Sequence, residues 1–305
     1  MAREIVLPPT GEPGSRQAGS LLFIGNATVL LRYAGFVILT DPNFLHAGDR
    51  ARLGYGLLHA RRLTDPALEL DELPKLDLVL LSHNHEDHFD RKVARELDHA
   101  LPIVTTRQAA RKLAKKGFSA TVPLKTWEDV VFVKGNDRLR ITALPGRHGP
   151  GFISRLLPSV MGSMLEFETP EAKTLLRLYV SGDTLMHRDL RDIPKRFPEV
   201  DLGVFHLGGT RVLGVMVTMD GKQGAEAVRL IKPRTAVPVH FDDYDIFKSK
   251  LEDFQREVRA AGLEDRIRYL VRGEALSFQV VEGERLRPLP LRDELHKPSP
   301  HPPTT

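Results

Sequence analysis

Short apolar runs separated by turn residues open the chain, a pattern typical of strands. These runs occupy residues 21–24, 28–33 and 36–40. The dipeptides Gly25-Asn26 and Ala34-Gly35, which lie between them, favour tight turns. The pattern therefore predicts a meander of antiparallel strands at the start of the fold.

Strands and helices alternate through the rest of the chain. Apolar runs predict strands at 76–82, 103–104, 130–133, 139–144, 175–181, 201–206 and 235–239. Helical composition predicts helices at 91–97, 107–116, 187–196, 221–231 and 246–260. Strands followed by helices imply sheets whose outer faces are covered, so the predicted class is α/β. One folded domain is expected over 20–290, after an N-terminal polar tail at 1–19 and before a disordered, proline-rich tail at 291–305.

Composition and charge restrict the possible functions and the residue types that can bind a metal ion. The 305 residues are 41% hydrophobic, which supplies a sizeable core, and the net charge of +4 is spread along the chain, so no nucleic-acid partner is expected. No apolar run approaches the length of a membrane span, and a cytoplasmic protein is expected. The chain lacks cysteine, so a metal site can use only His, Asp and Glu.

The string His-Asn-His-Glu-Asp-His at 83–88 directly follows the apolar run 76–82. So many imidazole and carboxylate groups at the end of a buried strand favour a metal site. The spacing aims His83 and His85 to one side, whereas Asp87 and His88 can turn toward a neighbouring point. One loop can therefore serve two metal ions.

Three further candidate ligands end or follow predicted strands: His148, Asp183 and His240. Chemistry in α/β folds usually gathers at strand ends that lead into loops. The carboxylates Asp242, Asp243 and Asp245 crowd the loop of His240 and could compete with it as ligands. Asp41 follows the run 36–40, and we expect it to orient ligands without contacting metal, because ligating imidazoles donate their other N–H to a carboxylate or carbonyl.

Taken in order, these motifs resemble those of the metallo-β-lactamase fold superfamily. The resemblance spans residues 20 to about 245 and is carried by the segments 40–42, 82–88, 181–184 and 238–240, together with His148. The segments 25–30 and 39–42, Trp127-Glu128 and Met219-Asp220 are most similar to the branch of ascorbate-6-phosphate lactonases and N-acyl-phosphatidylethanolamine phospholipase D.

The resemblance implies a four-layer αββα sandwich with the site at one sheet edge. It implies that His83, His85 and His148 hold one metal ion, that Asp87, His88 and His240 hold the second, and that Asp183 bridges the two. The expected cofactor is Zn²⁺, two ions per chain, with Mn²⁺ or iron as alternatives.

The chain departs from the branch pattern at two positions. Asn26 stands where that branch usually carries His, and His206 stands where relatives often carry an apolar residue or Pro. The sequence favours two interpretations of His206 equally. It can be a histidine of the core, or it can reach the cavity of the metal site, and in the second case it is a candidate catalytic residue. Flavodiiron relatives carry Glu where His85 stands, so di-iron oxygen chemistry is the less favoured alternative.

A dinuclear site predicts hydrolysis. Two divalent ions about 3.5–4 Å apart share a water and lower its pKa, so that a metal-bridging hydroxide attacks a phosphodiester, ester or lactone. Asp87 is expected both to bind metal and to aim that hydroxide. Arg211 and Phe152, the latter in the apolar segment 151–161, are candidate contacts for a small-molecule or lipid-like substrate, although a surface arginine and a loop packed on its own domain are the plainer readings.

Two other functions stay open alongside di-iron oxidation. One is β-lactamase-type amide hydrolysis by the same ions. The other is a metal-binding sensor or scaffold that keeps the ligands without turnover. The sequence indicates neither the physiological substrate nor the oligomeric state.

Overall fold

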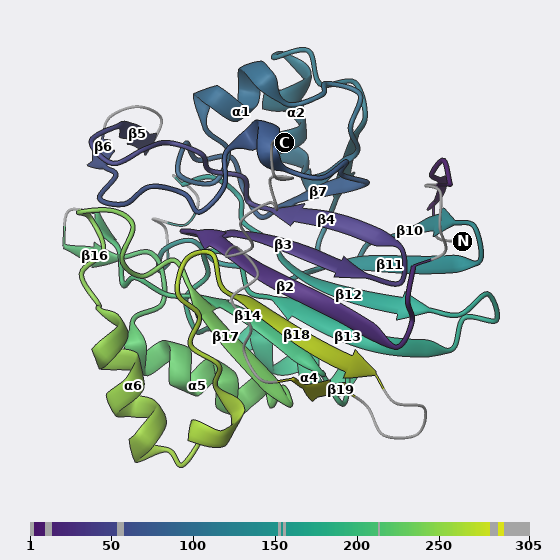
Figure 1. The fold of residues 1–305 in the computed structure, drawn as a ribbon. Coiled ribbons are helices and arrows are strands. Elements are labelled where there is room, and N and C mark those ends of the chain that lie inside the picture. Colours follow the sequence, from purple (N-terminus) through teal and green to yellow (C-terminus); the bar gives the residue numbers. More distant parts are fainter. Residues whose placement is uncertain are drawn as a thin grey trace, which may run out of the picture.

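Two β-sheets stack face to face, and helices cover the outer face of each sheet (Figure 1). The computed structural model describes residues 3–9, 14–53, 58–151, 154, 157–212, 214–280 and 286–289. The prediction of a four-layer αββα sandwich is confirmed. Phe152 and the expected C-terminal tail at 291–305 lie outside the described residues.

The first sheet has eight strands and contains the predicted meander. In spatial order its strands are β19 (Leu286–Pro288), β18 (Ala275–Val280), β2 (Ala18–Gly25), β3 (Thr28–Tyr33), β4 (Phe36–Thr40), β7 (Leu78–Leu81), β8 (Ile103–Thr106) and β9 (Thr121–Leu124). The turns at 25–26 and 34–35 join antiparallel neighbours, as predicted. From β4 onward the strands run parallel, so their carboxyl ends share one edge.

The second sheet has seven strands. In spatial order they are β1 (Arg3–Val6), β10 (Asp129–Lys134), β11 (Asp137–Leu144), β12 (Gly162–Glu168), β13 (Thr174–Val180), β14 (Leu202–His206) and β17 (Thr235–Val239). The strands β13, β14 and β17 are parallel. Two hairpins stand outside both sheets: β5 (Arg50–Leu53) with β6 (Leu58–Arg61), and β15 (Arg211–Val212) with β16 (Val215–Met216).

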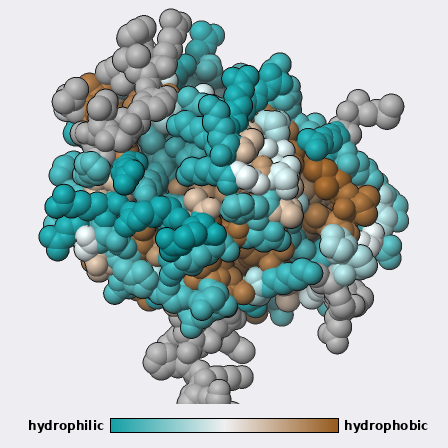
Figure 2. Space-filling view, turned by 90° about the horizontal axis from the view of Figure 1, so that it is seen from above, coloured by the Kyte–Doolittle hydropathy of each residue, from teal (hydrophilic) through white to brown (hydrophobic). Residues whose placement is uncertain are grey.

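Helices lie on both outer faces. They are α1 (Arg91–Glu96), α2 (Arg107–Ala114), α4 (Ile193–Arg196), α5 (Gly221–Ile231) and α6 (Leu251–Ala260), with short 3₁₀ turns η2 (Leu70–Glu72), η3 (Arg188–Asp192) and η4 (Glu264–Arg266). The side chains of Asp90 and Asp220 accept hydrogen bonds from free N–H groups in the first turns of α1 and α5, which fixes where these helices begin. Figure 2, which views the molecule from above relative to Figure 1, shows a hydrophilic surface interrupted by hydrophobic areas.

The core is layered like the fold. One apolar cluster draws on both sheets and includes Phe23, Phe132 and Phe167. Two further clusters lie beneath the helices: one joins α1 and α2 to the eight-stranded sheet, and the other joins α5 and α6 to the seven-stranded sheet. Burying both faces of each sheet holds the strand ends in fixed positions.

Several elements differ from those expected. The strands β5, β6, β9, β15, β16, β18 and β19 were not predicted, and the helix expected at 246–260 begins only at Leu251. Arg3–Val6 form β1, paired in parallel with β10, whereas a polar tail was expected over 1–19. The prediction failed there because four residues at a sheet edge show no clear periodicity. The strand β12 was not predicted, since it is buried at every position instead of alternating. The helix expected at 187–196 is a 3₁₀ turn followed by a single helical turn. Among the described residues, no helix is both long and apolar enough to cross a bilayer.

Candidate metal centre

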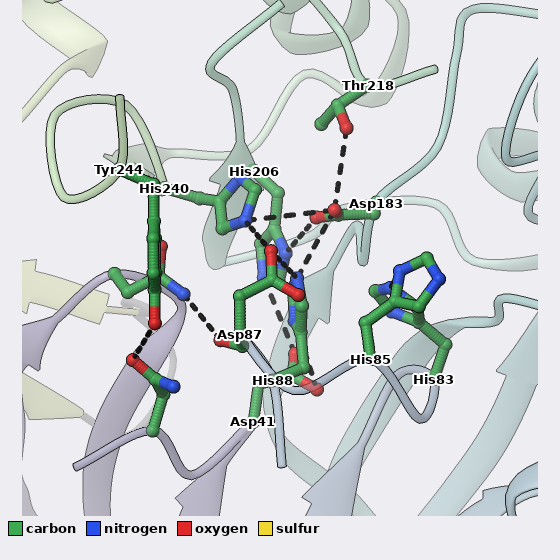
Figure 3. A network of polar contacts seen from close by, with 12 residues as sticks. Asp41, His83, His85, Asp87, His88, Asp183, His206, Thr218, His240 and Tyr244 are labelled. Carbon is green, nitrogen blue, oxygen red and sulfur yellow. Dashed lines mark hydrogen bonds and ion pairs between the residues drawn. The ribbon is translucent and has the colours of Figure 1, made fainter. Parts of the chain in front are cut away.

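The predicted ligands converge at the edge where parallel strands of the two sheets end. The 83–88 loop follows β7, Asp183 follows β13, and His240 follows β17. Asp41 follows β4, next to β7, and His206 is the last residue of β14. His83 and His85 lie on one side of the centre and His240 on the other, with Asp183 and Asp87 between them (Figure 3).

Three histidines form the first group of potential ligands. His83, His85 and His148 each offer a nitrogen within 4.8 Å of the others. Burial lowers the pKa of all three imidazoles, that of His85 to about 3, so they are neutral and keep a lone pair for a metal ion. The Nδ1 atom of His148 lies 3.0 Å from the carbonyl oxygen of Val217, which orients the ring.

The second group contains Asp87, His88, Asp183 and His240. The Oδ2 atom of Asp183 lies 3.2 Å from His88 Nε2 and 3.7 Å from His240 Nε2. The two groups adjoin, because the ring centroids of His83 and His88 are 4.2 Å apart. The centre can therefore hold two cations side by side.

Charge within the second group is strongly coupled. Burial alone lowers the pKa of His88, but the Asp183, Asp87 and Asp41 carboxylates raise it well above its usual value. Burial raises the pKa of Asp183, but His240 and His88 bring it well below the usual range. The carboxylates thus favour positive charge at this group, which a bound divalent cation can supply.

Unpartnered buried atoms support a metal ion at this place. His85 Nε2, Asp87 Oδ1, His88 Nε2 and His240 Nε2 are buried without a hydrogen-bond partner in the described part of the chain. An unsatisfied buried polar atom destabilises a fold by about 1–3 kcal/mol, so a cluster of them requires a compensating ligand. The nitrogen and oxygen donors fit two divalent cations such as zinc.

Asp41 lies next to the candidate ligands and forms a third group of potential ligands with His88 and His206, so its expected role in orienting ligands stays a prediction. Its Oδ1 atom accepts hydrogen bonds from the backbone N–H and the hydroxyl of Ser82, at 2.8 and 2.9 Å, and lies 3.5 Å from His88 Nδ1. Its backbone φ is +36°, a conformation that few non-glycine residues adopt. The carboxylate thereby ties the end of β4 to the start of the ligand loop.

His206 is both buried and part of the centre. Its Nδ1 atom lies 3.1 Å from Asp183 Oδ1, and its Nε2 atom lies 3.9 Å from Asp41 Oδ2. The ring stacks near His88 and His240, with both centroid distances 5.8 Å. His206 is therefore a buried histidine and also a neighbour of the candidate metal ligands. A catalytic role for His206 stays a prediction.

Two acidic residues near His240 form ion pairs with arginines and do not belong to the candidate ligand groups. Asp243 forms a buried ion pair with Arg62 at 3.0 Å, and Asp242 pairs with Arg272 at 2.9 Å. His240 itself has a φ of +63° and donates its backbone N–H to the Asn26 carbonyl at 2.9 Å. Of the acidic and histidine side chains in this loop, His240 is the one that belongs to the candidate ligand groups.

Two supporting residues escaped sequence reasoning. Asn26 Nδ2 donates a hydrogen bond to the backbone carbonyl of Asp87 at 2.6 Å, and its φ of +53° suits asparagine in a tight turn. Thr218 Oγ1 donates to Asp183 Oδ2 at 3.4 Å. The Gly-Asn dipeptide signalled the turn at Asn26 but not this contact, and no pattern pointed to Thr218.

The predicted substrate contacts remain untested. Arg211 is exposed on β15 and donates to the carbonyl of Gly214 in its own hairpin. In the segment 151–161, Val160 and Met161 are buried, and Met161 packs in the core between the sheets. The end of that segment therefore serves packing.

The chain matches the beta-lactamase superfamily domain over residues 34–241 and belongs to that family. The resemblance to the metallo-β-lactamase fold superfamily is confirmed. Among similar sequences, a UPF0173 metal-dependent hydrolase of Anaeromyxobacter sp. (strain K) is 26% identical over 209 residues, which cover 68% of this chain and 73% of the relative.

Solved structures share the fold at low identity. An isothiocyanate hydrolase from Delia radicum gut bacteria superposes with a TM-score of 0.72 and 22% identity, covering 86% of this chain and 100% of the other. A protein of Veillonella parvula DSM 2008, described as a possible metal-dependent hydrolase, gives a TM-score of 0.68 and 21% identity, covering 86% and 99%.

Proposed function

We propose that this protein is a dinuclear, zinc-dependent hydrolase that cleaves a phosphodiester, ester or lactone in a small or lipid-like substrate. The adjacency of a three-histidine group and a two-histidine, two-carboxylate group carries the proposal. The lack of cysteine leaves nitrogen and oxygen donors, which suit zinc and also manganese or iron. The names of the curated relatives as metal-dependent hydrolases support the reaction class.

Under this proposal, different residues would hold each of the two metal ions. His83, His85 and His148 would hold one ion, Asp87, His88 and His240 the other, and Asp183 would bridge them. Bound divalent ions supply a water that is acidic enough to act as a nucleophile near neutral pH, together with positive charge for the developing oxyanion. Asp87 Oδ1, buried without a hydrogen-bond partner among described residues, can accept a hydrogen bond from the attacking water and aim it.

His206 is proposed to position Asp183. Replacement His206→Ala removes the Nδ1 contact with the carboxylate, and we expect zinc affinity to fall about 10- to 100-fold, as for other groups that orient metal ligands. His206→Asn keeps a short donor and should lose less. Zinc dissociation constants, measured by chelator competition, test this. A lower melting temperature with unchanged zinc affinity would show that His206 only supports packing.

Chelation tests the reaction itself. Zinc-loaded protein should hydrolyse bis-p-nitrophenyl phosphate or an acyl-homoserine lactone, lose at least about 90% of that rate with EDTA, and recover it on addition of zinc, because the ions create the nucleophile. The same assay with His85→Ala should stay near background, and nitrocefin tests amide hydrolysis.

The other functions predict different results. Nitrocefin turnover alone would replace the ester and phosphodiester proposal with a β-lactamase-type activity. If zinc binds tightly and raises the melting temperature but no substrate is hydrolysed, the result would favour a sensor or scaffold. Coloured, iron-loaded protein from ordinary growth would favour di-iron oxidation.

A further inference from the structure

A basic pocket of about 290 Å³ opens beside the metal centre. It is lined by Arg52, Asn84, His85, Glu86, Phe89, Arg91, Lys112 and Lys116. His85 belongs both to this pocket and to the three-histidine group, and at 8% it is the most exposed of the predicted metal ligands. A molecule whose reacting bond lies at the metal centre can therefore extend into the pocket past His85.

Positive charge in the pocket exceeds negative charge. Arg91 is neutralised by Asp49 at 2.8 Å and by Glu86, the single acidic residue of the lining, at 3.3 Å. In the part of the chain that the structure describes, the Arg52 guanidinium and the Lys116 ammonium form no ion pair; Lys116 Nζ lies 6.0 Å from the centre of the Phe89 ring. Arg52, Lys112 and Lys116 all line this one cavity, so its lining carries more positive than negative groups.

These charges come from separate elements. Arg52 belongs to the β5–β6 hairpin, whereas Lys112 lies on α2 and Lys116 follows one turn later. Burial and the nearby Lys116 charge lower the pKa of Lys112, which shows that like charges meet there. The exposed Arg111 and Lys115 of the same stretch do not line the pocket. Two basic side chains of this stretch, Lys112 and Lys116, therefore face the pocket.

A donor without a partner lies in the same lining. Asn84 Nδ2 is buried and has no hydrogen-bond partner among the described residues. A carboxylate or phosphate group accepts several hydrogen bonds and carries the charge that relieves repulsion between lysines. Both features of the pocket suit an anion.

We propose that this pocket binds an anionic group of the substrate, a carboxylate or a phosphate monoester, that lies outside the bond being cleaved. The inference rests on the proposed function, since it names the substrate class of the same centre. The neighbouring centre would supply the hydrolytic chemistry when metal is bound, and Lys112, Lys116 and Arg52 would select substrates that carry a second, negatively charged group.

A paired variant with a matched control tests the selection. Lys112→Gln/Lys116→Gln removes two charges from the lining, and Arg111→Gln/Lys115→Gln removes two exposed charges from the same stretch. With p-nitrophenyl hydrogen succinate, whose acyl arm is a carboxylate, the pocket variant should show a KM raised about tenfold, equivalent to 1.4 kcal/mol. Its kinetics with neutral p-nitrophenyl butyrate, and those of the control variant with both esters, should match the parent protein.

Calorimetric titration measures anion binding to the pocket directly, without hydrolysis of a substrate. Succinate and phenyl phosphate are titrated into the zinc-loaded parent protein and both variants, whose metal centres are identical, so differences in Kd report the pocket. The pocket variant should bind one or both anions about tenfold more weakly, and the anion affected tells carboxylate from phosphate recognition. Added salt should shrink the difference.

Equal dissociation constants in all three proteins, at matched zinc content and melting temperature, would overturn the proposal. If neither ester is hydrolysed and the substrate panel is silent, the hydrolase proposal fails. A tenfold calorimetric difference would still establish the anion pocket in that case.

Discussion

Asp183→Asn is expected to lower zinc content from about two ions per chain to fewer than one and to reduce kcat/KM at least about 100-fold. The carboxylate lies within 4 Å of ring nitrogens of His88, His206 and His240, and its negative charge would lower the repulsion between two bound metal ions. The amide has nearly the same shape but no charge, so packing around it is preserved. Elemental analysis after dialysis and steady-state kinetics measure both effects.

Asp192→Asn provides the matched control. This carboxylate has 52% of its side chain exposed and pairs with Lys195, three residues later. Its loss should leave zinc content and kcat/KM within twofold of the parent protein, about 0.4 kcal/mol. Full metal content and full activity in Asp183→Asn would refute the bridging role.

Arg62→Ala should lower the free energy of unfolding by about 3–5 kcal/mol, because removing one partner of a buried ion pair leaves an uncompensated charge. Arg62 is fully buried, lies 3.0 Å from Asp243, and also donates to Asn43 and to the Thr64 carbonyl. Denaturant titration measures the change. Asp243 in turn accepts a hydrogen bond from the backbone N–H of Asn26, and the Asn26 side chain donates to the Asp87 carbonyl. Arg62→Ala should therefore also weaken zinc binding, because Asp87 would be held less firmly.

Arg61→Ala separates this effect from a general loss of positive charge. Arg61 is adjacent in sequence but exposed, and its substitution should change the free energy of unfolding by less than about 0.5 kcal/mol. An Arg62→Ala variant as stable as Arg61→Ala would mean that the other partners of Asp243, Thr64 and Arg272, are sufficient to hold its charge.

The basic pocket and the metal centre are joined by the ligand loop. Glu86, between two predicted ligands, accepts a hydrogen bond from the Arg52 backbone N–H at 2.6 Å and pairs with Arg91. The loop that carries the candidate ligands His85 and Asp87 is thus also anchored to the β5–β6 hairpin and to α1. Selection of the substrate and positioning of the metal ligands therefore depend on one short segment.

The sequence by itself determined the fold class and the candidate metal ligands. Apolar runs that end in turn residues define strands locally, and the spacing within 83–88 places several donors on one loop whatever the rest of the chain does. His148, Asp183 and His240 could be found in the same way, because each stands at or just after a predicted strand end. These features depend on residues near one another in the chain.

Only the tertiary structure decided how those residues combine. Three contacts join segments that lie far apart in the chain: His206 with Asp183, Asn26 with the Asp87 carbonyl, and Arg62 with Asp243. These residues are 23, 61 and 181 positions apart. The basic pocket likewise needs β5, the ligand loop and α2 to meet. Such contacts arise from the packing of the two sheets and their helices, and no local pattern of polar and apolar positions records which distant partners that packing brings together.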